Sequence, residues 1–214
     1  MVRLKIIKCG GVNCYLLSEN GNSILIDTAT YKYRDKVFNI CKNNNVRLIV
    51  LTHGHPDHIQ NAAFLSEELN IPVAIGEGDE ELIFDRNAEH MKTEGLIGKA
   101  IMFFSNADPK MNVVPLFIPT YLLKEGDSLK DFGVNAEIIS LPGHTTGSIG
   151  VVCGPSVFVG DALMNIFAPS LPVIYEDMDQ AVKSAVKIKN LGKKKIFFGH
   201  GTPVEASGLS VLNL

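Results

Sequence analysis

Short apolar runs separated by polar turns dominate the chain, and they predict a strand-rich protein. Residues 2–9 and 13–19 flank a Gly-Gly turn and predict two antiparallel strands, and residues 23–27 predict a third. Residues 35–43 carry apolar positions at helical spacing and lead into the strand that contains the apolar run at 48–51. This order indicates a strand, helix, strand crossover, as in a parallel pair of strands.

The remaining pattern alternates in the same way. A helix is predicted from about 57 to 69, a strand at 72–75 and a helix at 79–93. The second half predicts one long helix at 177–191 and strands near 121–123, 136–141, 148–153, 157–160 and 195–198. We therefore expect a single domain over residues 1–214 with an α+β fold: two mixed β-sheets packed face to face and flanked by helices, a four-layer αββα sandwich.

One stretch does not follow this alternation. Residues 95–120 are irregular and unusually apolar, and an Asn-Ala-Asp-Pro turn at 106–109 divides them. They are either additional core or an insert that shapes a substrate pocket or a homodimer face.

Composition narrows the classes of protein that remain. With 20 basic and 23 acidic residues, the net charge of −3 argues against a nucleic-acid partner. No run approaches the roughly 18 apolar residues of a membrane span. The first residues lack the apolar core of a signal peptide, and the four cysteines show neither paired nor zinc-finger spacing. We expect a cytoplasmic protein with reduced, mostly buried thiols.

The candidate chemistry begins where the apolar run at 48–51 ends. His53, His55, Asp57 and His58 follow it within seven residues. In extended backbone His53 and His55 would point to the same side, whereas Asp57 and His58 lie beyond the corner made by Pro56. Crowding three imidazoles and a carboxylate is costly without a cation, so the stretch predicts a metal site, and two adjacent metal positions fit it better than one.

Three later residues repeat this placement at strand ends. His144 follows the predicted strand at 136–141, Asp161 follows the one at 157–160, and His200 follows the one at 195–198. Each lies in or beside a Gly-containing turn. The sixth histidine, His90, lies on a polar segment far from any strand end and is expected to be a surface residue.

Four motifs in this order resemble those of the metallo-β-lactamase superfamily. They are Thr-His-Gly-His-Pro-Asp-His at 52–58, Pro-Gly-His-Thr-Thr-Gly-Ser at 142–148, Gly-Asp-Ala-Leu at 160–163 and Phe-Gly-His-Gly at 198–201, preceded by Ile-Leu-Ile-Asp-Thr at 24–28. The resemblance implies the αββα fold. It also implies that His53, His55 and His144 hold a first metal, that Asp57, His58 and His200 hold a second, and that Asp161 bridges them.

Imidazole and carboxylate ligands without thiolate suit two divalent ions, Zn²⁺ first, with Fe or Mn as alternatives. Water between two such ions loses a proton near neutral pH, so we expect a metal-bridging hydroxide that attacks the carbonyl of an ester, thioester, lactone or amide. Asp57 is the expected catalytic group that orients this hydroxide and passes its proton onward. The candidates for fixing the histidine rings are Asp27, Thr52, Thr145 and Ser148.

The chain lacks sequence features of several specialised branches of this superfamily, and their absence favours a stand-alone hydrolase of small molecules. Only 14 residues follow His200, fewer than the glutathione-binding extension of glyoxalase II-like thioesterases needs, and no tyrosine closely follows Asp161 as in acyl-homoserine lactonases. An export signal, a nucleic-acid-processing insert and a flavin domain are also missing. The alternative is a mononuclear iron oxidoreductase resembling persulfide dioxygenases, which use part of the same motif set.

Overall fold

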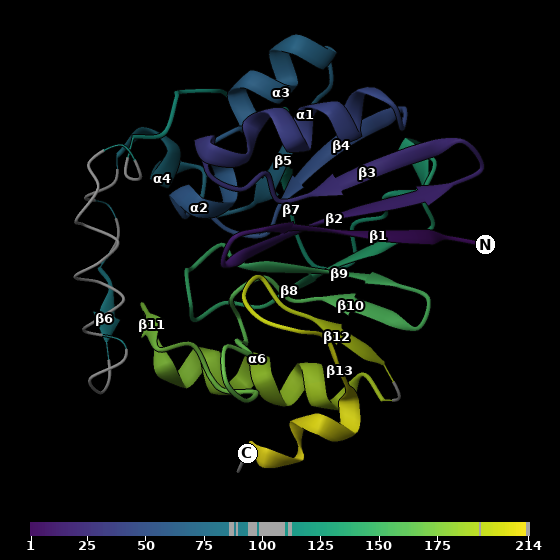
Figure 1. The fold of residues 1–214 in the computed structure, drawn as a ribbon. Helices are drawn as coiled ribbons and strands as arrows, with labels where there is room; N and C mark the ends of the chain where they lie inside the picture. Colours follow the sequence, from purple (N-terminus) through teal and green to yellow (C-terminus); the bar gives the residue numbers. More distant parts are fainter. Residues whose placement is uncertain are drawn as a thin grey trace.

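The computed structural model describes residues 1–85, 88, 90–93, 98, 110, 113–192 and 194–212. Strands between residues 3 and 123 form one mixed sheet (Figure 1). Three antiparallel strands open it, and the following strands run parallel. In spatial order they are β1 (Arg3–Cys9), β2 (Val12–Glu19), β3 (Asn22–Ile26), β4 (Val46–Leu51), β5 (Val73–Gly76) and β7 (Tyr121–Leu123).

The second half supplies the other mixed sheet, in which only β10 and β12 run parallel among the described pairs. Its order is β13 (Val204–Glu205), β12 (Lys195–Phe197), β10 (Ser156–Phe158), β9 (Ile149–Cys153) and β8 (Glu137–Ser140). A small third ladder pairs β11 (Ile174–Tyr175) with β6 (Lys92–Thr93), and neither strand was predicted.

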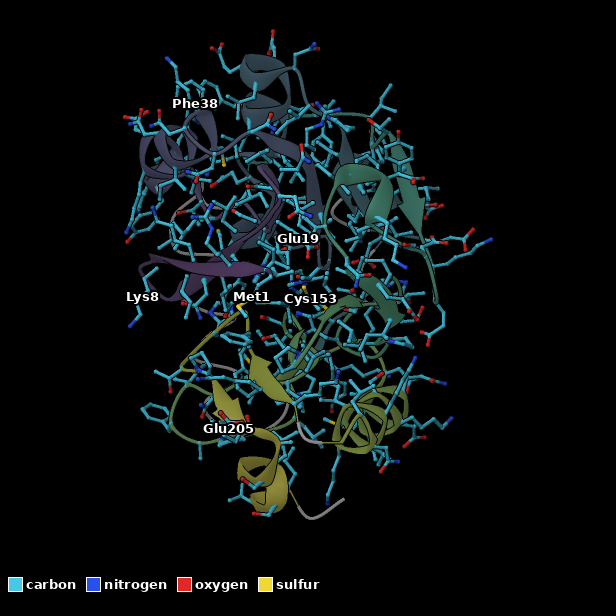
Figure 2. All side chains as sticks on the ribbon, turned by 90° about the vertical axis from the view of Figure 1, so that its right-hand side faces the viewer. Met1, Lys8, Glu19, Phe38, Cys153 and Glu205 are labelled. Atoms are coloured by element: carbon cyan, nitrogen blue, oxygen red, sulfur yellow. The ribbon has the colours of Figure 1, made fainter. Side chains whose placement is uncertain are left out.

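Helices cover the two outer faces of the sheets. In Figure 1, α1 (Arg34–Lys42) and α3 (Ala62–Leu69) lie above the first sheet, and α6 (Met178–Asn190) lies below the second. The side view in Figure 2 shows the same order, with Phe38 of α1 at one end and Glu205 of β13 toward the other. The predicted αββα sandwich is therefore confirmed.

The alternation of side chains along β4 produces these layers. Ile49 and Leu51 pack in the apolar cluster shared with α1 and α3, whereas Leu48 and Val50 pack in the cluster between the two sheets. All four side chains are fully buried, because the strand is covered on both faces. A third cluster joins the second sheet to the Ala185 and Ile188 stripe of α6.

Aromatic rings pack between the two sheets. The ring of Tyr15 in β2 lies 4.9 Å from that of Phe158 and 5.6 Å from that of Phe197, both in the second sheet. The Tyr15 hydroxyl donates to the Phe198 carbonyl, which satisfies its buried polar atom. The end of β12 is thereby fixed against the first sheet.

Two predicted helices differ from the structure. The helix predicted at 57–69 is two helices, α2 (Pro56–Ile59) and α3, because the buried Asn61 amide turns away to donate to three loop carbonyls. The helix predicted at 79–93 was wrong: the described residues show only α4 (Glu81–Phe84) and then β6. His90 is exposed, as expected. Short 3₁₀ helices complete the described chain at Tyr31–Tyr33, Lys130–Phe132 and Ala206–Val211.

The four cysteines are buried free thiols, which confirms that part of the prediction. Burial raises the pKa of Cys41 to about 12, so this thiol stays protonated. None of the helices in the described parts of the chain has the length and apolar character that crossing a bilayer requires.

Candidate metal centre

The site begins at the end of β4, in the middle of the first sheet. The chain leaves the strand at Thr52, and Pro56 occupies the first turn of α2, where its missing N–H costs nothing. His53 and His55 therefore lie in the connecting loop, while Asp57 and His58 lie in the helix. Residues 53–58 thus place four side chains of the metal-ligand type close together at the end of β4.

Three imidazole nitrogens from both sheets form a first cluster. His53 Nε2 lies 3.0 Å from His55 Nδ1, and His55 Nδ1 lies 2.8 Å from His144 Nε2. His144 comes from the loop that joins β8 to β9 in the second sheet. Two of the three side chains are buried and His55 is half-buried.

A second cluster lies beside it. The Nε2 atom of His200, which follows β12, lies 3.3 Å from Asp57 Oδ2 and 3.4 Å from His58 Nε2. The Asp57 and His200 side chains are 31% and 18% exposed, whereas that of His58 is fully buried. The second cluster therefore faces the solvent more openly than the first.

Asp161 touches both clusters. Its Oδ2 atom lies 3.1 Å from His200 Nε2 and 3.8 Å from His144 Nε2, and its Oδ1 atom lies 3.6 Å from His58 Nε2. Oδ1 is buried, and the described residues offer it no hydrogen bond. An unsatisfied buried carboxylate oxygen is costly unless a cation or an unrecorded donor meets it.

The outer nitrogens of the histidine rings settle which nitrogen faces inward. Four Nδ1 atoms lie within 3.0 Å of an oxygen that can accept, since the Thr52 hydroxyl gives its own proton to Asp27, so each Nδ1 carries a proton and each Nε2 points into the site. The pairs are His53 with Thr52 Oγ1, His58 with Asp27 Oδ2, His144 with the Ile174 carbonyl and His200 with the Gly11 carbonyl. The Nε2 atoms of His58 and His200 lie 3.4 Å apart, close enough to share one cation once their protons are lost, so the donor set fits metal ions.

Charge pairing dominates the protonation of the second cluster. Burial lowers the pKa of His58, but the carboxylates of Asp57, Asp27 and Asp161 outweigh it and raise that pKa to about 9. Burial and the neighbouring His55 lower the pKa of His144 to about 4. His144 is therefore a neutral imidazole near pH 7, which is the form that metal ligation requires.

Asp27 and Thr52 lie where the sequence suggested. Asp27 is buried; its Oδ1 accepts from the Thr52 N–H at 2.8 Å, and its Oδ2 accepts from the Thr52 hydroxyl at 2.9 Å and from His58 Nδ1 at 2.8 Å. The backbone of Asp27 takes a left-handed conformation, with φ of 58°. One carboxylate thus fixes both a ligand ring and the loop before His53.

We expect Asp27→Asn to weaken metal binding about ten- to hundredfold, because the amide offers His58 Nδ1 at best a neutral acceptor. Calorimetric titration of the metal-free variant with Co²⁺ measures this change in affinity. The exposed Asp131→Asn substitution removes a similar carboxylate far from the site and provides the control. Unchanged Co²⁺ affinity in Asp27→Asn would contradict this role.

Thr145 and Ser148 act differently from the prediction. The ring of His144 is held by the Ile174 carbonyl at 2.7 Å, while the two hydroxyls lie 2.6 Å from each other. The Thr145 hydroxyl then donates to Asp79 Oδ2 at 2.7 Å. A short turn brings the two hydroxyls together, so they fix the loop and not the imidazole.

Sequence reasoning missed Asp79. It is fully buried in the turn after β5, and burial raises its pKa to about 6 while three donated hydrogen bonds limit the rise. The signal was present, because Glu77-Gly78-Asp79 follows an apolar strand in the way that Asp161 does. We placed it instead at the start of a helix.

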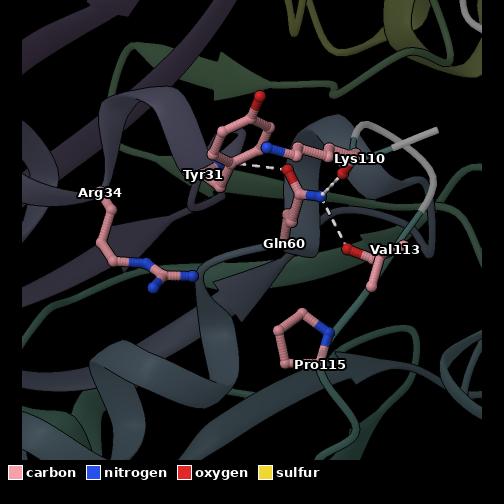
Figure 3. A pocket seen from close by; sticks show the side chains of 6 residues that line it. All are labelled: Tyr31, Arg34, Gln60, Lys110, Val113 and Pro115. Atoms are coloured by element: carbon pink, nitrogen blue, oxygen red, sulfur yellow. Dashed lines mark hydrogen bonds between the residues drawn. The ribbon is translucent and has the colours of Figure 1, made fainter. Parts of the chain in front are cut away.

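A pocket of about 340 Å³ lies near α2 (Figure 3). Gln60, two residues after His58, accepts from the Tyr31 N–H at 2.8 Å and donates to the carbonyls of Lys110 and Val113 at 2.7 Å. These two carbonyls belong to the apolar segment predicted at 95–120, most of which lies outside the described residues. The pocket is lined by Tyr31, Arg34, Gln60, Lys110, Val113 and Pro115.

Comparison with known proteins agrees with this arrangement. The family model of the metallo-beta-lactamase superfamily matches residues 7–200. Hydroxyacylglutathione hydrolase 1 of Vibrio vulnificus is 27% identical over 194 residues, which are 87% of this chain and 60% of the relative. The probable metallo-hydrolase MJ0888 of Methanocaldococcus jannaschii is 26% identical over 196 residues, 88% of this chain and 87% of the relative.

A solved structure shares the fold. TTHA1623, crystallised in a di-iron-bound form, superposes with a TM-score of 0.71 at 24% identity, covering 98% of this chain and 97% of that one. This chain spans only 60% of the length of the Vibrio relative, so the match does not extend over that whole protein.

Proposed function

Because this chain belongs to the metallo-β-lactamase superfamily, we propose that it is a metal-dependent hydrolase that cleaves a carbonyl compound: an ester, thioester, lactone or amide of a small molecule. The observation that carries the proposal is the pair of side-chain clusters joined by Asp161. Structural sites seldom combine such a ligand set with a half-exposed carboxylate such as Asp57.

We assign the residues of each cluster to one ion. His53, His55 and His144 would hold the first ion. Asp57, His58 and His200 would hold the second, with Asp161 between them. When bound, the two ions supply a nucleophilic hydroxide at neutral pH and Lewis-acid polarisation of the substrate carbonyl.

The chain's own groups supply orientation and proton transfer. The protonated Nδ1 atoms of His58 and His144 are held at Asp27 and Ile174, so both rings keep Nε2 directed inward. Asp57 Oδ2 lies at the more open side of the site, where it would orient the attacking water and take its proton. His58 and His200 keep the pKa of Asp57 well below its usual range despite its partial burial, so the carboxylate is ionised.

Ligand chemistry and the names of relatives support the choice of candidate metals and substrates. Imidazole and carboxylate ligands suit Zn²⁺, and TTHA1623 binds two irons, so iron stands beside zinc as a candidate. One relative is named a hydroxyacylglutathione hydrolase, which places acylated glutathione in the substrate panel with esters and lactones. We also propose that the protein works in the cytoplasm, where its buried thiols stay reduced.

Metal analysis of protein purified without added metal or chelator tests the proposal first. We expect close to two zinc, iron or manganese ions per chain, loss of hydrolysis after chelation and recovery when the ion returns. A stable content of one iron per chain, with oxygen uptake on thiol or persulfide substrates, would replace the hydrolase with the oxidoreductase alternative.

A further inference from the structure

Asp79 joins the two loops that carry the first cluster. Its Oδ2 atom accepts from the Gly54 N–H at 2.7 Å and from the Thr145 hydroxyl at 2.7 Å, and its Oδ1 atom accepts from the Gly147 N–H at 2.6 Å. Gly54 lies between His53 and His55, and Thr145 follows His144. One buried carboxylate therefore links the neighbours of all three first-cluster histidines.

The two loops belong to different sheets, so ladder hydrogen bonds within a sheet do not set their separation. The loop with His53 and His55 follows β4 of the first sheet, and the loop with His144 connects β8 and β9 of the second sheet. A direct backbone bond joins them at one point, from the Ile149 N–H to the Thr52 carbonyl at 2.8 Å. Nearer the ligands, Asp79 makes the connection.

The packing around Asp79 leaves little freedom for the His144 loop. A Cβ on Gly147 would lie 2.4 Å from the Asp79 backbone nitrogen and 2.7 Å from Oδ1, so glycine allows this close approach. Charged acceptors hold backbone N–H groups more strongly than neutral ones. The carboxylate therefore holds the His144 loop against the loop that carries His53 and His55.

The second cluster has a different support. Asp27 contacts the ring of His58 directly, and the recorded bonds of Asp79 run to Gly54, Thr145 and Gly147. His200 is oriented by the Gly11 carbonyl and Asp57 lies in α2. Among the described residues, Asp79 thus contacts only the loops of the first cluster, whereas Asp27 contacts His58 directly and reaches His53 through Thr52.

We propose that Asp79 is a positioning residue for the first metal position, which it maintains by fixing the distance between the two ligand loops. This inference rests on the proposed metal centre. Among the described residues, Asp79 hydrogen-bonds to no ligand side chain, and its bonds to the ligand loops run to the Gly54 and Gly147 backbone and to Thr145.

Single-position variants separate the two halves. His200→Ala keeps the ligands of the first position, and His144→Ala keeps those of the second. Calorimetric titration of the metal-free proteins with Co²⁺ then measures each position alone. We expect Asp79→Asn to weaken Co²⁺ binding about ten- to hundredfold in the His200→Ala background and to leave it unchanged in the His144→Ala background.

Glu77→Gln is the matched control, because Glu77 is an exposed carboxylate in the same turn, and we expect no change in either background. Thr145→Val keeps the shape of the side chain but removes one donor to Asp79; it should weaken the first position in the same direction and serves if Asp79→Asn does not fold. Equal weakening of both positions, or none, would overturn the inference. Failure of the unsubstituted protein to bind Co²⁺ would instead overturn the metal centre on which it rests.

Discussion

Asp57→Asn is expected to lower the rate of hydrolysis by about 10²- to 10⁴-fold while metal remains bound. The amide keeps an oxygen that can face a metal but cannot accept a proton at neutral pH. Asp57 Oδ2 lies 3.3 Å from His200 Nε2, on the more exposed side of the site, so its loss acts on proton transfer more than on the fold. Turnover and metal content, measured on the same preparation, test this expectation.

Two results would contradict it. Unchanged turnover would remove Asp57 from proton transfer, and loss of one ion together with activity would assign it to metal retention alone. Asp131→Asn, which removes an exposed carboxylate from a 3₁₀ helix of the second half, should leave both turnover and metal content unchanged.

Gly199→Ala is expected to disrupt the site and destabilise the fold together. A Cβ at this position would lie 2.1 Å from Asp161 Oδ1 and 2.7 Å from His58 Cε1, both buried side chains. Either the carboxylate moves away from its histidines or the backbone between β12 and His200 shifts. We expect a loss of about 2 to 3 kcal/mol in the free energy of unfolding and a lower metal content.

Denaturant unfolding of the metal-free proteins separates the two effects. Gly11→Ala is the matched control for stability, since its Cβ meets no atom within 4 Å, and we expect a change below about 0.5 kcal/mol. Unchanged stability and metal content in Gly199→Ala would show that the Asp161 carboxylate can occupy another position.

Periodicity and strand-end chemistry predicted the architecture because both are local properties. The run at 48–51 is apolar on both faces and is buried on both faces, so the sequence indicated a central strand and the structure confirms it. The helix predicted at 177–191 matches α6, whose Asp177 N-cap accepts from the Gln180 N–H. Such signals need no knowledge of the rest of the chain.

Long-range contacts determined what the sequence did not show. The break between α2 and α3 depends on Asn61, whose amide reaches carbonyls 31 to 33 residues away. The segment after β5 carries a helical pattern, yet Asp79 turns back to bond 25 and 66 residues away. Local propensity cannot anticipate such partners, and tertiary contacts override it.

The same distinction applies to the site. Every candidate ligand could be named because each stands at a strand end or in the first turn of the helix that follows one. The structure brings them together; whether they bind metal stays a prediction. Thr145 and Ser148 were correctly placed near the site but given the wrong contact, since a loop hydroxyl can face either an imidazole or a neighbouring strand's turn.

The seam between the two sheets has a consequence for resistance to unfolding. His58 and His200 are 142 residues apart in the chain, and their nitrogens are 3.4 Å apart in space. An ion bound by both residues would cross-link the two sheets and close a very long loop of the chain. Separation of the sheets would then require ligand bonds to break, so proteases should attack the metal-loaded protein more slowly than the metal-free one.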